Sequence, residues 1–135
     1  GGFGGRGGAI VNIASAAALM PGTGLSVYGA SKGAVAHFTQ SAAVESGALG
    51  HNVRVNCIMP GMIETNMATK LGVDFAHLGL VKDEPELRAG MLEKIALKRY
   101  AATKEIGSVA LFLCSEASSY MTGACLPVDG AISLA

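Results

Sequence analysis

The sequence predicts an α/β fold built on a parallel sheet, and three observations support this prediction. Residues 9–14 (AIVNIA) and residues 53–59 (VRVNCIM) are short apolar runs rich in β-branched side chains, as expected of buried strands. Residues 26–46 between them have the length and composition of a helix. A strand, a long helical crossover and a second strand form a βαβ unit, in which the two strands run parallel.

Small side chains dominate the helix expected over residues 26–46. Its bulkier apolar residues Val35, Phe38 and Val44 lie among two glycines and five alanines. Because small side chains let other segments approach closely, we expect this helix to be covered on more than one side.

The segment after Pro60 is polar and mixed as far as about Lys82, and no element is assigned to it. The sequence DEPE at residues 83–86 then indicates a helix start, with a capping Asp, an early Pro and acidic residues in the first turn. Leu87, Met91 and Ile95 repeat at intervals of four, which gives this helix one apolar face.

Two more elements complete the chain. Thr103 is expected to cap a helix that extends to about Cys114, and residues 126–128 predict a last short strand before Asp129. Pro127 places that strand near an edge of the sheet, because proline cannot donate to a neighbouring strand. The side chains expected on the buried face of the helix over residues 103–114 are Ile106, Val109, Ala110 and Leu113.

Composition excludes several classes of protein. The chain has 135 residues, 13.6 kDa and 50% apolar residues, which suits one domain with a real core. Its 10 basic and 10 acidic side chains cancel, and only 15% of residues are charged. This balance argues against a disordered tail and against a general nucleic-acid binder.

The apolar stretch near the start imitates a membrane span or a signal peptide. No charged residue occurs between Arg6 and Lys32, but Pro21, Gly22 and Gly24 interrupt the stretch and would break a helix in lipid. The chain also begins at Gly1 rather than at an initiator methionine, from which we expect a piece of something longer. We therefore expect no membrane association and a cytoplasmic location.

Residues 1–8 are a glycine-rich lead-in with a formal G-x-G-x-x-G at Gly2, Gly4 and Gly7. A dinucleotide-binding loop must follow a strand and open a helix, whereas these glycines precede the first strand. We interpret the segment as a flexible lead-in; an RGG-like RNA segment is the alternative, but it contains only one Arg.

The cysteines and histidines show no ligand pattern. Cys57, Cys114 and Cys125 are odd in number, far apart and without a C-x-x-C motif, from which we expect three buried thiols in a reducing compartment. The three histidines share no spacing with them, so we expect no metal site. They are His37, His51 and His77.

Tyr28 and Lys32 carry the first indication of chemistry, because a spacing of four places them on one face of a helix. A phenol in water titrates near 10, too high for proton transfer at neutral pH. A shift of two to three units takes roughly 3–4 kcal/mol. One cation at about 4 Å supplies that energy at an effective dielectric constant of about 20.

The spacing by itself is not specific, because Tyr100 and Lys104 share it. Thirteen positions before Tyr28 stands Ser15, directly after the first apolar strand, whereas Leu87 occupies the matching place before Tyr100. A hydroxyl at the carboxyl end of a strand lies where α/β sheets bind ligands. We therefore expect Tyr28 at the site and interpret Tyr100 and Lys104 as a surface pair.

Four motifs in order resemble the short-chain dehydrogenase/reductase family. They are AIVNIAS at residues 9–15, the pair Tyr28 and Lys32, PGMIET at residues 60–65, and SYMTG at residues 119–123 followed by VDG at residues 128–130. The resemblance covers nearly all of the chain from Gly8 onward and corresponds to the carboxyl-terminal half of that family. It implies a Rossmann-type, doubly wound parallel sheet, represented by its last three strands and their helices.

The resemblance also implies roles for individual residues. Ser15 would hold the substrate oxygen, Tyr28 would exchange the proton, and Lys32 would favour the ionised phenol and bind the nicotinamide ribose. The cofactor, NAD or NADP, would meet residues of the PGMIET motif. Pro60 and Gly61 would shape the turn beneath the nicotinamide, Ile63 would meet its carboxamide through backbone groups, and Thr65 would bond toward the pyrophosphate.

The implied activity is NAD(P)-dependent interconversion of a secondary alcohol and a ketone. Residues 9–135 would form the carboxyl-terminal half of one oxidoreductase domain, with residues 66–101 as the substrate lid and a homo-oligomer as the full-length assembly. The family's T-G-x-x-x-G-x-G turn and its asparagine before Ser15 have no counterpart in this sequence. Two alternatives stay open: an inactive fragment that acts as an assembly partner, and another Rossmann-type domain such as a methyltransferase.

Overall fold

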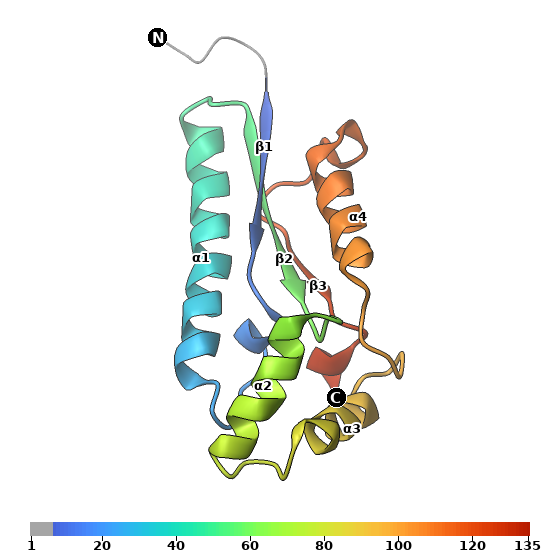
Figure 1. The fold of residues 1–135 in the computed structure, drawn as a ribbon. Helices are drawn as coiled ribbons and strands as arrows, with labels where there is room; N and C mark the ends of the chain where they lie inside the picture. Colours follow the sequence, from blue (N-terminus) through green and yellow to red (C-terminus); the bar gives the residue numbers. More distant parts are fainter. Residues whose placement is uncertain (1–6) are drawn as a thin grey trace.

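The computed structural model describes residues 7–135 as a three-stranded parallel sheet in the order β1-β2-β3, with α1 on one face and α4 on the other (Figure 1). Helices α2 and α3 lie beyond one end of the sheet. The strands are β1 (Gly8–Ile13), β2 (Val53–Pro60) and β3 (Cys125–Val128); the α-helices are α1 (Ser26–Ala48), α2 (Asn66–His77), α3 (Glu84–Lys94) and α4 (Thr103–Cys114). Short 3-10 helices are η1 (Ala16–Ala18), η2 (Glu116–Ser118) and η3 (Ile132–Leu134).

This arrangement confirms the predicted α/β class and its parallel strands. Strand β1 begins at Gly8, one residue earlier than expected, and β2 extends one residue further, to Pro60. Strand β3 is an edge strand, as Pro127 predicts. Most of the glycine-rich lead-in lies outside the described residues, which start at residue 7.

Strand β2 is the centre of the sheet, and residues 55–59 of this strand are all buried. It pairs with β1 and β3, while helices cover both faces, so its run of apolar residues is expected. Asn56 is the polar exception and is fully buried. Its amide nitrogen donates to the Met121 carbonyl at 2.8 Å, and its amide oxygen accepts from the Ala124 N–H at 3.0 Å. These two bonds satisfy the side chain and tie β2 to the start of β3.

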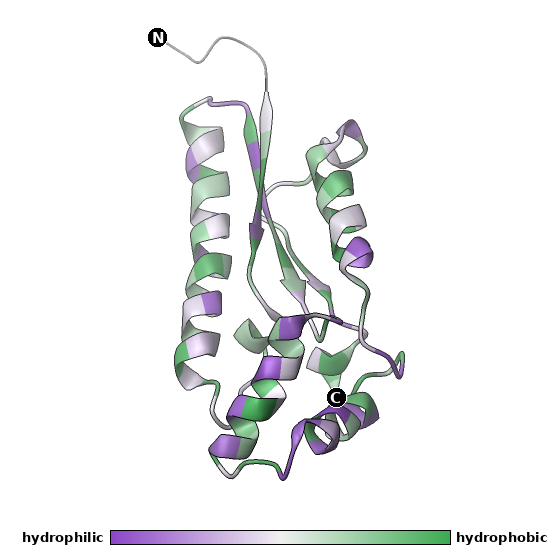
Figure 2. Ribbon diagram, viewed as in Figure 1, coloured by the Kyte–Doolittle hydropathy of each residue, from purple (hydrophilic) through white to green (hydrophobic). Residues whose placement is uncertain are grey.

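Among residues 7–135, helix α1 is covered on one side only, which differs from the sequence-based expectation. Its buried residues Thr39, Ala43 and Ser46 face the sheet, whereas Phe38 is 64% exposed and Val44 is 73% exposed. Figure 2 shows apolar colour on both sides of the helix. The small residues predict close packing correctly toward the sheet; the opposite side has no covering element among residues 7–135.

Helix α2 occupies the segment that the sequence left unassigned. Thr65 caps it, because the Thr65 hydroxyl accepts the backbone N–H of Ala68 at 3.4 Å, and its buried residues are Gly72 and Phe75. Helix α3 begins as predicted, since the Asp83 carboxylate accepts the Glu86 N–H at 2.9 Å. The two helices pack closely, because a Cβ built on Gly72 would lie 2.6 Å from Cγ of Glu84.

Helix α4 starts differently from the prediction. Thr103 is its first residue and Ala102 its N-cap, so the prediction of Thr103 as the cap was wrong. The Glu105 side chain reaches back instead and accepts the Ala102 N–H at 2.8 Å, while Arg99 holds both carboxylate oxygens at 2.7 Å. The predicted inward face is confirmed: its four residues are buried or partly buried, and Leu113 is completely buried. The expectation of three buried thiols was wrong for Cys114, which ends this helix on its exposed side.

Two apolar clusters form the core. One lies between α1 and the sheet and contains Ala14, Cys57 and Met59. The other lies beyond the carboxyl ends of the strands, around Ile95 and Tyr100, and includes residues of η1 and η3. Among the described residues, no helix has both the length and the apolar character needed to cross a membrane.

The Glu105 contacts predict a pH dependence of stability. Hydrogen bonds from Arg99 and from the Ala102 N–H lower the pKa of Glu105 from 4.5 to about 2. A carboxylate whose pKa falls on folding stabilises the folded state above its unfolded value, and the contribution is lost as the pH falls from about 4.5 through about 2. We expect urea unfolding to show a smaller loss of stability over this range in Glu105→Gln than in the wild type. Glu93→Gln is the control, because Glu93 forms no ion pair within residues 7–135, and an equal effect of both variants would contradict the prediction.

The unpaired edge of β1 predicts self-association of the chain. Strand β1 bonds to β2 on one side only among the described strands, and Ile10 is 49% exposed. Such an edge templates pairing with another strand, and a charge on it prevents this. We expect light scattering to show species larger than the 13.6 kDa monomer, and Ile10→Lys to shift the chain toward the monomer. Val44→Lys on α1 is the control; if it has the larger effect, association proceeds through α1 and not through β1.

Candidate active site

The carboxyl ends of the three strands bring the candidate residues to one edge of the sheet. The register places Ile13 opposite Ile58 and Pro60 opposite Val128, so the strand ends lie side by side. Ser15 follows β1, Gly61 follows β2 and Asp129 follows β3. Ligands of open α/β sheets bind at this edge, which makes it the natural place for a site.

Lys32 and Tyr28 lie together in the first two turns of α1, as their spacing predicts. The Lys32 ammonium is 5.7 Å from the centre of the Tyr28 ring. The same ammonium donates to the carbonyl of Ile13 at 3.2 Å. Lys32 is therefore held by the end of β1 with its ammonium over the ring of Tyr28, a residue that is 42% exposed.

Ser15 caps the short helix η1 and keeps a free hydrogen-bonding group. Its backbone is extended, with φ −166° and ψ 154°, and its Oγ accepts the N–H of Ala17 at 3.1 Å. A serine hydroxyl accepts with its lone pairs and still has one O–H to donate. Capping and binding of a substrate oxygen are thus compatible, because the cap uses only an acceptor.

Gly29 allows η1 to approach α1; the small residues of this helix predict a close approach, but the sequence did not identify η1 as the segment that makes it. A Cβ at position 29 would lie 2.9 Å from the carbonyl oxygen of Ala17. A real Cβ contact at that distance forces the backbone to move. The glycine next to Tyr28 therefore lets the segment that carries Ser15 pack directly on the helix that carries Tyr28 and Lys32.

The turn of residues 60–65 follows β2 and depends on a second close approach. The Gly61 N–H donates to the Val128 carbonyl at 3.1 Å, and a Cβ at Gly61 would lie 2.7 Å from Cα of Asp129. Only glycine fits there without displacing the end of β3. Gly61 therefore holds this turn, called the 60–65 turn below, against the neighbouring strand.

A parallel bridge fixes the backbone of Ile63. Its bridge partner is Ala101, whose N–H donates to the Met62 carbonyl at 3.0 Å and whose carbonyl accepts the Glu64 N–H at 2.9 Å. In a parallel bridge, the hydrogen bonds to Ala101 are made by the two residues that flank Ile63. The N–H and carbonyl of Ile63 itself therefore point away from Ala101. Thr65 donates to that carbonyl at 3.4 Å. The Ile63 N–H is left available to a bound group.

Tyr100 is a buried core residue, which corrects the prediction of a surface pair with Lys104. Its side chain is 5% exposed and packs with Ile95. The Arg88 guanidinium lies 4.3 Å from the centre of its ring. Burial raises the pKa of Tyr100 above 10, and the positive charge of Arg88 partly opposes this shift.

Arg88 also reaches Glu64 in the 60–65 turn, a contact that sequence reasoning missed. Arg88 Nη1 lies 3.1 Å from one carboxylate oxygen of Glu64, and Nη2 bonds to the other. The hydrogen bonds from Arg88 hold the pKa of Glu64 below its ordinary value of 4.5. No local sequence pattern predicts this ion pair, because the two residues are 24 positions apart and lie in different segments.

A parallel sheet with helices on both faces and candidate residues at the carboxyl ends of its strands is a Rossmann-type arrangement. The family model for enoyl-(acyl carrier protein) reductase matches residues 4–133. The chain belongs to the short-chain dehydrogenase/reductase family, which removes the methyltransferase alternative.

Among similar proteins, 3-oxoacyl-[acyl-carrier-protein] reductase FabG of Chlamydia pneumoniae is 39% identical over 128 residues, which cover 95% of this chain and 46% of that protein. The 2-(R)-hydroxypropyl-CoM dehydrogenase of Xanthobacter autotrophicus is 40% identical over 124 residues, which cover 92% of this chain and 45% of that protein. The chain therefore spans about half the length of the curated relatives it matches.

Solved structures agree with this assignment. A putative short-chain alcohol dehydrogenase from Sinorhizobium meliloti superposes with a TM-score of 0.80 and 38% identity, covering 96% of this chain and 46% of the other. A putative 2-deoxy-D-gluconate 3-dehydrogenase from Agrobacterium tumefaciens, solved with bound NADP, gives a TM-score of 0.78 and 35% identity, covering 96% and 48%. These structures confirm the predicted Rossmann-type fold.

Gly29 and Gly33 provide a matched test of the packing that brings Ser15 to α1. A Cβ at Gly33 meets nothing within 4 Å, so Gly33→Ala should raise the free energy of unfolding by roughly 0.5–1 kcal/mol through helix propensity. Gly29→Ala gains the same propensity but places its Cβ 2.9 Å from the Ala17 oxygen, and we expect a net loss of stability. Denaturant unfolding measures both variants. Equal stabilisation by the two alanines would contradict the close approach.

Proposed function

We propose that this chain carries the acid–base part of a site that interconverts a secondary alcohol and a ketone with NAD or NADP. The observation that supports this most directly is the position of Lys32, whose ammonium donates to the Ile13 carbonyl and lies over the Tyr28 ring, 5.7 Å from its centre. A nearby cation is the kind of neighbour that a tyrosine requires for acid–base chemistry.

Three residues of this chain would perform the proton chemistry. In ketone reduction, the Tyr28 hydroxyl donates its proton to the carbonyl oxygen; in alcohol oxidation, the phenolate takes the hydroxyl proton back. The Ser15 O–H donates a hydrogen bond to the same substrate oxygen and orients it. Lys32 stabilises the phenolate while Tyr28 is ionised. When bound, the nicotinamide cofactor supplies or accepts the hydride.

The residues of the 60–65 turn fit a dinucleotide. The Ile63 N–H points away from its bridge partner and suits a carboxamide oxygen, and Gly61 keeps the turn close to β3. Thr65 lies at the N-terminus of the 12-residue helix α2, an end that favours a negatively charged group. With Pro60 shaping the turn and Tyr28 and Lys32 near the ribose, these residues would hold the nicotinamide half of the cofactor. They do not distinguish NAD from NADP.

The alternative is a chain that assembles with a partner and has no catalytic activity of its own. The exposed edge of β1 and the uncovered side of α1 favour this alternative. Both proposals share the expectation that the 135-residue chain by itself binds no measurable NAD(H) or NADP(H), because about half of the relatives' length is not represented in it. A homo-oligomer, a small alcohol or ketone substrate and residues 66–101 as the substrate lid remain predictions.

Tyr28→Phe is the decisive variant. We expect it to lower kcat by about 10²–10⁴-fold, because it removes the group that transfers the proton, while cofactor affinity changes little. The assay uses a fusion in which this chain replaces the matching 46% of the Chlamydia pneumoniae reductase, with NADPH oxidation followed on a panel of ketones. Fluorescence titration of the same fusion measures cofactor affinity.

Tyr120→Phe is the matched control, since Tyr120 is fully exposed and lies outside the site. Retention of more than about a tenth of kcat in Tyr28→Phe would exclude the proposed acid–base role. A wild-type fusion that folds and binds NADPH but turns over no ketone would favour the assembly alternative.

A further inference from the structure

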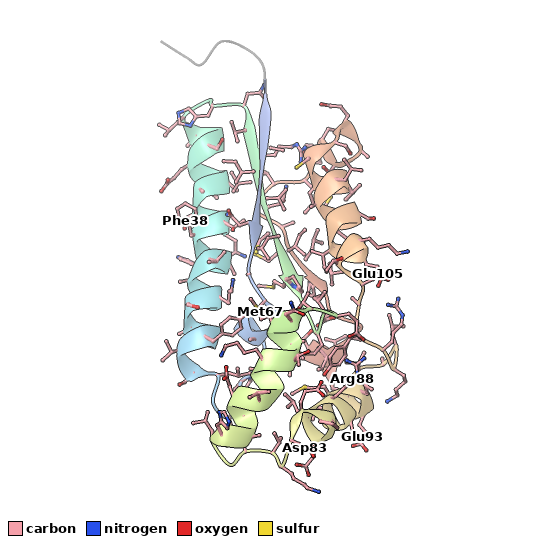
Figure 3. The ribbon with its side chains drawn as sticks, in the orientation of Figure 1. Phe38, Met67, Asp83, Arg88, Glu93 and Glu105 are labelled. Atoms are coloured by element: carbon pink, nitrogen blue, oxygen red, sulfur yellow. The ribbon has the colours of Figure 1, made fainter. Side chains whose placement is uncertain are left out.

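Arg88 connects three segments that are distant in the sequence. Its guanidinium bonds to both carboxylate oxygens of Glu64 in the 60–65 turn, and the same planar group stacks over the buried ring of Tyr100. Arg88 itself belongs to α3, where that helix faces the lower end of the sheet (Figure 3). One side chain thus contacts the turn after β2 and the segment that leads to α4.

These contacts reinforce the backbone bridge that orients Ile63. Glu64 donates its N–H to the Ala101 carbonyl, and Tyr100 immediately precedes Ala101. Arg88 therefore holds the side chains of two residues whose backbones already form or adjoin the bridge. A guanidinium suits this double role, because its edge donates to a carboxylate while its face packs on an aromatic ring.

The solvent exposure of the Arg88–Glu64 ion pair indicates that the pair acts locally and not on the stability of the whole fold. The side chains of Arg88 and Glu64 are 37% and 51% exposed, and ion pairs this open to solvent contribute little to global stability. The core around Tyr100 is formed by apolar residues such as Ile95 and Ile132, which pack without Arg88. Loss of Arg88 should therefore loosen the contact of α3 with the turn, while Met62, Met91 and Leu92 still pack on the same apolar cluster and the sheet stays intact.

The second bidentate Arg–Glu pair of the described residues provides the contrast. Arg99 and Glu105 are similarly exposed, at 54% and 36%, and meet at 2.7 Å. They are only six positions apart and secure the start of α4. That pair stabilises a helix end, whereas the Arg88–Glu64 pair joins α3 to the turn that carries Ile63 and Thr65.

We propose that Arg88 is a positioning residue, which holds α3 on the 60–65 turn and so couples the segment of residues 66–101 to the binding of the dinucleotide. The coupling part, which links α3 to binding of the dinucleotide, rests on the proposed function of the 60–65 turn. The mechanical part, which is the attachment of α3 to that turn by Arg88, does not. With Arg88 in place, Ile63 and the start of α2 keep the geometry in which they face the cofactor. Without it, α3 and the turn separate more often and the cofactor-binding geometry is populated less.

Amide hydrogen exchange of the full chain tests the mechanical part without any cofactor. We expect Arg88→Met, which keeps an unbranched stem and removes the guanidinium, to speed exchange about five-fold in α3 and in residues 60–65, with β2 unchanged. Arg88→Lys keeps the charge and should restore part of the protection. Arg99→Met is the matched control; because Arg99 bonds to the Tyr100 carbonyl and to Glu105, it should affect residues 99–105 and leave α3 protected. Unchanged protection in Arg88→Met, or the same loss in Arg99→Met, would overturn the proposal.

The fusion with the Chlamydia pneumoniae reductase tests the coupling. We expect Arg88→Met to weaken NADPH affinity about five-fold while kcat at saturating NADPH stays near the wild-type value. Partial recovery of affinity in Arg88→Lys is expected, because a structural defect elsewhere would not respond to the restored charge. Wild-type affinity in Arg88→Met, despite faster exchange, would show that α3 is held by Arg88 but does not control the cofactor. A wild-type fusion that binds no NADPH would instead contradict the proposed function and leave the exchange result standing.

Discussion

The parallel pairing of β2 with both of its neighbours is the constraint on which the rest of the structure depends. Parallel strands require crossovers, and these crossovers supply α1 on one face and α4 on the other. Burial on both faces accounts for the apolar sequence of β2. The same direction of all three strands brings Ser15, Gly61 and Asp129 to one edge, so the site follows from the direction of the strands before any side chain is considered.

Two glycines then allow these neighbouring segments to pack in direct contact. Gly29 lets η1 reach α1, and Gly61 lets the 60–65 turn reach β3; in each case a single Cβ would meet backbone within 3 Å. The approach at Gly29 places the Ile13–Ser15 end of β1 beside Lys32, whose bond to the Ile13 carbonyl fixes the ammonium near Tyr28. The packing of the candidate site therefore depends on two positions that carry no side chain: Gly29 beside Tyr28 and Lys32, and Gly61 in the 60–65 turn.

The sequence predicted what local patterns determine. The strands, α1, α3 with its Asp83 cap, and the Tyr28–Lys32 pair follow from periodicity, capping and spacing within a few residues. Helix α2 was missed, because its polar composition hides the spacing of Ala68, Leu71 and Phe75, and its Thr65 cap was assigned to the cofactor. The burial of Tyr100 and its Arg88 and Glu64 neighbours could not be predicted, since these contacts join three elements and no local rule relates them.

The two halves of the candidate site differ in how they tolerate sequence change. In the proposed function, Ser15, Tyr28 and Lys32 would act through side-chain atoms, so almost any substitution would remove the group that performs the chemistry. Ile63 would act through its backbone, which the bridge to Ala101 orients whatever its side chain is. In the 60–65 turn, the residues that shape the backbone are therefore the constrained ones. Gly61 is constrained because a Cβ does not fit there, and Glu64 because it bonds to Arg88. A search for the site that weighs only polar side chains therefore finds the acid–base half and overlooks the half that would hold the cofactor.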